Sequence, residues 1–230
     1  MKNTTTLILI FLATMLQAQT SANRFYYELN YKPKKNSETI EKTMTVLDIS
    51  DKKSLYQDYS LMAKDSLMKV QIEEMQKTGQ FKNMNNLMTM PKFAYKVLKK
   101  YPTMELIFTE TMLTAPNPIQ LGYKENPKIK WKIDKEKQNI GEYKTQKATT
   151  EFGGRKWTAW FSSEIPLQDG PYKFHGLPGL IVKIEDEEKN YSWTLKGNKK
   201  IDNYQEVSFL EKMQNRGGTN NIVEVTKEKF

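Results

Sequence analysis

Apolar and polar residues alternate with a period of two along much of the chain. In "RFYYELNYK", residues 24–32, Phe25, Tyr27, Leu29 and Tyr31 fall on one side. Successive side chains of a strand point to opposite faces, so such a segment is expected to be a strand with one buried face. The segments with strand-like patterns are 24–32, 40–49, 53–60, 92–99, 103–109, 128–133, 142–151, 155–165, 179–186 and 191–197.

Two of the connections between these segments are typical of hairpins. Gly153-Gly154 separates two β-rich runs, and a two-residue loop of this kind suits a primed turn. The run at 180–186 is followed by the charged, turn-prone residues 187–190 and then by the run at 191–197. In the second strand of the first hairpin, Trp160 lies on the face opposite to Trp157. Apolar residues on both faces indicate a strand that is covered on both sides.

A helical pattern interrupts the strands at residues 61–78, where Leu61, Met68, Ile72 and Met75 recur on one face. The sequence therefore predicts a mainly β protein. We expect an antiparallel curved sheet or partial barrel of about nine or ten strands, with this helix packed against it. A two-sheet β-sandwich is the alternative.

The first eighteen residues are typical of a secretory signal peptide. Lys2 precedes an apolar run from Leu7 to Leu16, and Ala18 suits a cleavage site. The run is too short to span a bilayer, and no later run approaches that length. We expect an exported protein of the periplasm, outer envelope or medium, with one domain over 19–230. Its polar residues 214–230 are expected to be loosely ordered.

The absence of cysteine from the 230 residues excludes thiolate catalysis, CxxC redox chemistry and cysteine-ligated zinc. The formal net charge is +9, but the lysines are scattered along the chain. Nucleic-acid binding would require a basic stripe with stacking aromatics, and export argues against it. The charge instead favours contact with anionic envelope surfaces.

Three groups of residues could carry chemistry. His175 is the only histidine, so a catalytic or metal site that needs histidine must use it. Glu164 and Asp169 flank a short apolar segment and could serve a hydrolase as paired carboxylates. The thioethers of Met84, Met88 and Met90 could bind Cu(I), although methionines at such spacing also fill gaps in apolar packing. No cofactor is predicted.

The stretch 169–181 combines turn residues with aromatics. Leu177 precedes a proline and is pushed towards extended geometry, and Pro178-Gly179 suits a type II turn that launches a strand. These turns account for the structural residues Gly170, Pro171, Gly176, Leu177, Pro178, Gly179, Leu180 and Ile181. They do not account for the intervening aromatics and histidine. We expect a ligand site formed by Tyr172, Phe174, His175, Trp157, Trp160 and Trp131, with 169–179 as a rigid lip.

The stretch "GPYKFHGLPGLI" resembles the signature of the GLPGLI family, which is named for the hexapeptide Gly176 to Ile181. The likeness extends to "WKI" (131–133), "QKATTEFGGRKWTAWF" (146–161), "EIP" (164–166) and the N-terminal "YYELNYK". The family comprises small exported proteins of Bacteroidetes-type bacteria. The resemblance implies an envelope protein that accompanies outer-membrane uptake receptors, and it implies no particular reaction. Relatives often have cysteine just before "QKA", where this chain has Thr145.

Together these patterns and the family resemblance predict a non-enzymatic envelope module. It would bind an apolar or metal-containing ligand, or accompany an outer-membrane receptor or another envelope component. A secreted hydrolase that uses Glu164 and Asp169 is one alternative, and a methionine-based Cu(I)-handling protein is another. No nucleic-acid partner and no membrane-spanning segment are expected in the mature chain.

Overall fold

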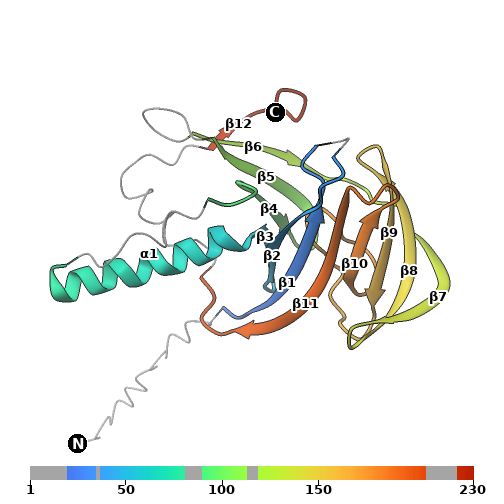
Figure 1. Ribbon diagram of the computed structural model, residues 1–230, viewed down its shortest axis with the longest axis horizontal. Helices are drawn as coiled ribbons and strands as arrows, with labels where there is room; N and C mark the ends of the chain where they lie inside the picture. Colours follow the sequence, from blue (N-terminus) through green and yellow to red (C-terminus); the bar gives the residue numbers. More distant parts are fainter. Residues whose placement is uncertain (1–19, 35–36, 81–89, 113–118, 206–221) are drawn as a thin grey trace, which may run out of the picture.

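The computed structural model describes residues 20–34, 37–80, 90–112, 119–205 and 222–230. These residues form one curved sheet and one helix (Figure 1). The strands are β1 (Ala22–Tyr31), β2 (Glu41–Ile49), β3 (Lys53–Asp58), β4 (Tyr95–Lys100), β5 (Glu105–Met112), β6 (Ile119–Glu125), β7 (Lys132–Ile140), β8 (Tyr143–Phe152), β9 (Arg155–Ser162), β10 (Leu180–Asp186), β11 (Tyr191–Ile201) and β12 (Ile222–Glu224). The helix is α1 (Tyr59–Thr78).

The twelve strands lie in the order β12-β6-β5-β4-β3-β2-β1-β11-β10-β9-β8-β7. Every neighbouring pair is antiparallel except β12 and β6, which are parallel. The sheet curls in Figure 1, and its inner face carries the core. One register row across that face consists of Tyr123, Phe108, Val97, Tyr56, Leu47 and Phe25, all of which are buried.

The predicted fold class, a mainly β protein with a curved antiparallel sheet, is confirmed. The described residues form twelve strands instead of nine or ten, because β6 and β12 lie in segments without clear alternation. The strand predicted at 128–133 is wrong in its bounds, since β7 begins only at Lys132. Residues before it leave the sheet, because the Trp131 indole Nε1 donates to the backbone oxygen of His175 at 2.8 Å. The apolar side of this segment therefore includes Trp131, which covers the loop that contains His175.

Helix α1 differs from the prediction in its packing. Asp58 caps its first turn and Gly79 ends it in a left-handed conformation, so its bounds agree with the helical pattern. None of its residues is fully buried, and it extends away from the sheet in Figure 1. It contacts β2 and β3, and Arg24 of β1 donates to the Met62 sulfur at 3.2 Å in its first turn. The predicted apolar face, Leu61, Met68, Ile72 and Met75, is half-buried.

Both predicted hairpins are present. Strands β8 and β9 pair up to the Phe152–Arg155 register at the Gly153-Gly154 turn, and β10 pairs with β11. Residues 222–230, expected to be loosely ordered, include strand β12 and a turn after it. The predicted signal peptide at 1–18 lies outside the described residues.

Gly179 has a positive φ, as the predicted Pro178-Gly179 turn requires, but its value of 153° differs from the roughly +80° of a type II turn. A second constraint is the close approach of strand β9. A Cβ atom at Gly179 would lie 2.2 Å from the backbone oxygen of Ser162. Glycine is required here because the backbones of the loop and of β9 nearly touch.

We predict that Gly179→Ala lowers the free energy of unfolding by about 2–4 kcal/mol, since the backbone must shift and the unfavourable φ adds strain. Gly197→Ala is the matched control, because a Cβ atom there meets nothing within 4 Å. Urea titration of both variants measures the difference. An equal and small loss in the two variants would contradict the packing argument.

Candidate functional site

The segment between β9 and β10, residues 163–179, lies across the inner face of the sheet. We call it the inner loop. Its side chains reach strands that are far apart in the sheet: Phe174 contacts Trp157 of β9, and Tyr172 contacts Tyr95 of β4. Tyr172 and Phe174 lie only two positions apart, so they can touch such distant strands only because the sheet curls around the loop. The inner loop is therefore part of the core, and it fills the space in which the sequence predicted an open ligand mouth.

Lys99 holds the inner loop through its ammonium group. Alternation along β4 points Tyr95, Val97 and Lys99 inward, and the Lys99 side chain is fully buried. Its Nζ donates to three backbone oxygens of the inner loop, those of Gly170 at 2.7 Å, Tyr172 at 3.2 Å and Phe174 at 3.4 Å. These bonds satisfy carbonyl groups that would otherwise be buried without partners.

Asp169 supplies the charge that balances Lys99. The two side chains form a buried ion pair, and the Tyr101 hydroxyl donates to the same carboxylate. The backbone N–H of Gly170 also donates to Asp169 Oδ1 at 2.6 Å. Burial lowers the pKa of Lys99, and the Asp169 charge opposes that shift. Burial, and then the Asp169 charge, raise the pKa of Tyr101, which keeps its hydroxyl a donor.

A second lysine of the inner loop, Lys173, binds the other half of the sheet. Its Nζ lies 2.5 Å from Glu125 Oε1 and 2.5 Å from the Tyr123 hydroxyl, both on β6. It also lies 4.9 Å from the ring centres of Phe108 and Tyr123. Burial alone would raise the pKa of Glu125, but hydrogen bonds from Lys173 and Lys227 lower it overall. The inner loop is thus anchored to β4 and to β6 by two separate charged clusters.

Four of the six residues predicted as a ligand site do come together. The Phe174 ring is surrounded by Trp157 at 4.7 Å, Tyr172 at 6.3 Å and Trp131 at 6.4 Å between ring centres. Phe174 is fully buried and Trp157 nearly so, while Trp131 and Tyr172 are half-buried. Trp160 lies on the outer face of β9, where the Lys147 ammonium sits 5.8 Å from its ring. The cluster is a packed core in this structure, so ligand binding by it stays a prediction.

His175, the sixth predicted residue, is buried with 7% of its surface exposed. Its backbone pairs with Asp169 across the inner loop, and its Nε2 has no hydrogen-bond partner among the described residues. Burial and then the nearby Lys99 charge lower its pKa to about 4, although Asp169 acts in the opposite direction. The imidazole is therefore neutral at physiological pH.

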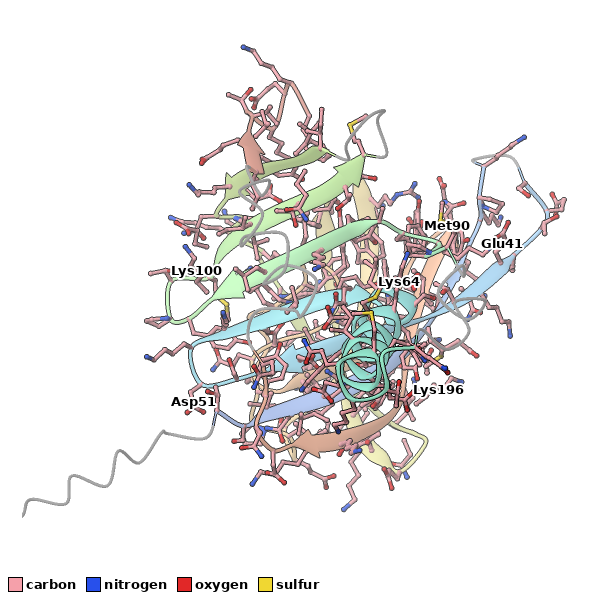
Figure 2. The ribbon with its side chains drawn as sticks, turned by 90° about the vertical axis from the view of Figure 1, so that its left-hand side faces the viewer. Glu41, Asp51, Lys64, Met90, Lys100 and Lys196 are labelled. Atoms are coloured by element: carbon pink, nitrogen blue, oxygen red, sulfur yellow. The ribbon has the colours of Figure 1, made fainter. Side chains whose placement is uncertain are left out.

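A hollow of about 380 Å³ lies where the inner loop begins, beside the Asp169 network. We call it the loop hollow. Figure 2 shows Asp51, from the β2–β3 turn, and Lys100, the last residue of β4, at this same end of the sheet. The backbone N–H of Tyr101 donates to the Lys52 oxygen at 2.8 Å and joins the two turns. The lining consists of Ser21, Asn23, Ile49, Ser50, Asp51, Tyr101, Pro102, Met104, Pro166, Leu167 and Gln168.

A second hollow of about 400 Å³ lies at the opposite end, between the β8–β9 and β10–β11 turns. Glu187 and Glu188 line it, and Arg155 binds Asp186 at 2.7 Å in its wall. Its lining is dominated by charged side chains that are already paired or solvated. None of the six predicted ligand residues lines either hollow.

The two alternative functions, hydrolysis and Cu(I) binding, have little of the geometry they require among the described residues. Asp169 is buried and paired, whereas the Glu164 side chain is 55% exposed and lies 3.5 Å from Lys144, so the two carboxylates do not converge. Met84 and Met88 lie outside the described residues, and Met90 is 64% exposed. Within the described ranges no three His, Asp or Glu side chains gather where they could hold a metal ion.

Lys99 and Tyr101 are the site residues that the sequence analysis missed. Side chains alternate between the two faces of β4, so Lys99 points inward together with Tyr95 and Val97. This alternation could have identified Lys99 as a buried charge from the sequence. Nothing local identifies its partner, because Gly170 lies 71 positions further along the chain. Asp169 was identified as a candidate, but for a catalytic role instead of a structural one.

We predict that Lys99→Met lowers the free energy of unfolding by about 3–5 kcal/mol, because it leaves the Asp169 carboxylate buried without its cation. Lys100→Met, the next residue of β4, is the control: it removes an exposed pair with Glu105 and should cost at most about 1 kcal/mol. The double variant Lys99→Met with Asp169→Asn should lose less than the sum of the two single losses in urea titrations. Additive losses would show that the ion pair does not hold the inner loop.

We predict that His175 makes the protein less stable as the pH falls from 6.5 to 4. Its pKa is lower in the folded than in the unfolded chain, so the stabilisation is present above pH 6.5 and is lost as the pH falls towards 4. The loss attributable to this residue should reach about 3 kcal/mol. Urea titrations at several pH values should show a weaker dependence in His175→Gln. Parallel curves for the two proteins would refute the assignment.

The comparisons with known proteins give the fold and no function. A family model described as "Protein of unknown function (Porph_ging)" matches residues 153–183, which contain the hexapeptide Gly176 to Ile181. Membership of the GLPGLI family stays a prediction based on the resemblance. No curated protein matches the chain. In the part of the chain that the structure describes, no helix is both long and apolar enough to cross a membrane.

The solved structures that match include PNGF-II in two crystal forms. The form in space group P21 has a TM-score of 0.58 and 15% identity over 92% of this chain. The C2 form has the same TM-score and identity over 91%. The matched region is 32% of the PNGF-II chain, so this protein spans about a third of that length. At this identity the likeness shows a shared β-rich fold.

Proposed function

We propose that the protein is an exported, non-enzymatic binding module that holds a small, largely apolar ligand in the loop hollow. The observation that carries the proposal is the lining of this hollow. Ile49, Pro102, Met104, Pro166 and Leu167 provide apolar contacts, and most of the remaining lining groups are uncharged hydroxyls and amides. Its volume falls in the range of about 300–1,000 Å³ that small-molecule sites occupy.

The walls of the loop hollow are preorganised. Tyr101 lines the hollow and donates its hydroxyl to Asp169, which is itself paired with Lys99. Leu167 and Gln168 immediately precede Asp169, so the same network positions the wall on the inner-loop side. A site whose walls are already ordered loses little conformational entropy when a ligand binds.

Export and the envelope context rest on the N-terminal pattern and on the family resemblance. Under this proposal the ligand is held for an outer-membrane uptake system or another envelope component. The hydrolase alternative has no converging carboxylates at Glu164 and Asp169. The loop hollow therefore favours binding over hydrolysis as the function of this end of the sheet.

The proposal predicts a ligand adduct on protein recovered from its own envelope, detected by native mass spectrometry. Gln168→Trp should abolish the adduct, because the exposed side chain lines the loop hollow and an indole would fill it. Glu187→Trp, in the second hollow, is the matched control and should keep the adduct. Protein that carries no adduct, or an adduct that survives in Gln168→Trp, would overturn the proposal.

A further inference from the structure

Strand β6 is covered along its outer edge by residues 222–230, which we call the edge segment. Its strand β12 pairs with β6 over Ile222–Gln120, Val223–Leu121 and Glu224–Gly122. The backbone N–H of Val225 adds a bond to the Gly122 oxygen at 2.9 Å. This is the one parallel pairing in the described sheet, and parallel pairing is slightly less stable per residue than antiparallel pairing.

The edge of β6 is shaped for this particular segment. A Cβ atom at Gly122 would lie 2.9 Å from Ile222 Cγ2, so the glycine leaves room for the incoming strand. The Phe230 ring packs edge-on against Phe108 and Tyr123, with ring centres 5.3 and 5.0 Å apart. Backbone pairing, side-chain space and aromatic contacts therefore all favour binding of the edge segment at this edge of β6.

Charge complementarity adds to the fit. Lys124 of β6 binds Glu224 at 2.9 Å, and Glu125 of β6 binds Lys227 at 2.6 Å. The same Glu125 also binds Lys173 of the inner loop. The edge segment therefore docks on the cluster that anchors the inner loop to β6.

The edge segment is nevertheless held less firmly than the other strands. Ile222 and Val223 are 50% and 47% exposed, and all three residues of β12 are exposed. Only three residues pair, against six or seven in the neighbouring β4–β5 and β5–β6 ladders. Such a strand can leave its edge without opening the core around Lys99.

We propose that the edge of β6 is a strand-acceptor site that also takes the edge segment of a second copy of this chain. An identical segment makes identical contacts, so exchange between two copies restores every bond that opening breaks. Residues 206–221 precede the edge segment, and a chain of that length can extend roughly 50 Å at about 3.3 Å per residue. Reciprocal exchange forms a closed, symmetric dimer in which the β6 edge of each copy is covered.

The protein concentration determines whether the closed monomer or the exchanged dimer predominates. A segment tethered to its own chain competes at an effective concentration on the order of 1 mM, so the closed monomer predominates in dilute solution. Crowding at a membrane surface, or refolding at high protein concentration, favours the exchanged dimer. No contact other than those already present in the monomer is required.

The test uses the absence of cysteine from the natural chain. One preparation carries Gln120→Cys and a second, mass-labelled preparation carries Ile222→Cys. These positions are registered neighbours across β6 and β12, so a disulfide between them suits the distance of about 4.4–6.8 Å between Cα atoms. The two proteins are unfolded together, refolded at high concentration and oxidised, and mixed dimers are counted by mass spectrometry.

The control replaces the Gln120→Cys partner with Lys156→Cys, an exposed position of β9. We expect several-fold more mixed disulfide dimer with Gln120→Cys than with the control, and less of it on dilution before oxidation. Adding Phe230→Ala to the Ile222→Cys chain should reduce the yield several-fold. Yields equal to the control would overturn the proposal. If circular dichroism shows that either variant does not refold, the next registered pair, Leu121→Cys and Val223→Cys, gives the same measurement.

Discussion

The buried ammonium of Lys99 is the interaction on which the rest of the structure depends. A loop can enter a protein core only if its backbone polar groups find partners, and Lys99 provides three hydrogen bonds to such groups. Asp169 neutralises the charge, which would otherwise be costly to bury. The sheet therefore curls around the inner loop. Phe174 is a core residue although it belongs to no strand.

This arrangement also bears on where the proposed ligand would bind. At the centre of the inner face, Phe174 packs against Trp131 and Trp157. The loop hollow lies instead at one end of the sheet, where Tyr101 connects the Asp169 network to the surface. The binding proposal thus rests on uncharged side chains at the start of the inner loop and not on the aromatics that follow.

The sequence predicted the parts of the fold that depend on local pattern. Alternation located β1 and the inward parity of Phe25, Tyr27, Leu29 and Tyr31, and the Gly153-Gly154 turn located a hairpin. It failed where the same pattern has another cause. Trp131 alternates with lysines because it covers the inner loop, and the predicted apolar face of α1 is only half-buried. Strand β12 escaped prediction because it spans only three residues, which is too short a run to show a period of two.

The sequence by itself determined the β class, the hairpins and a turn with positive φ at Gly179, because each of these follows from dihedral preferences and from the period of two. Tertiary structure alone decided that Lys99 meets Asp169, that the inner loop is a core element and that the edge segment closes the sheet at β6. The physical reason is distance along the chain. The local sequence pattern predicts which side chains face inward, but only the curvature of the whole sheet determines which of these side chains contact one another.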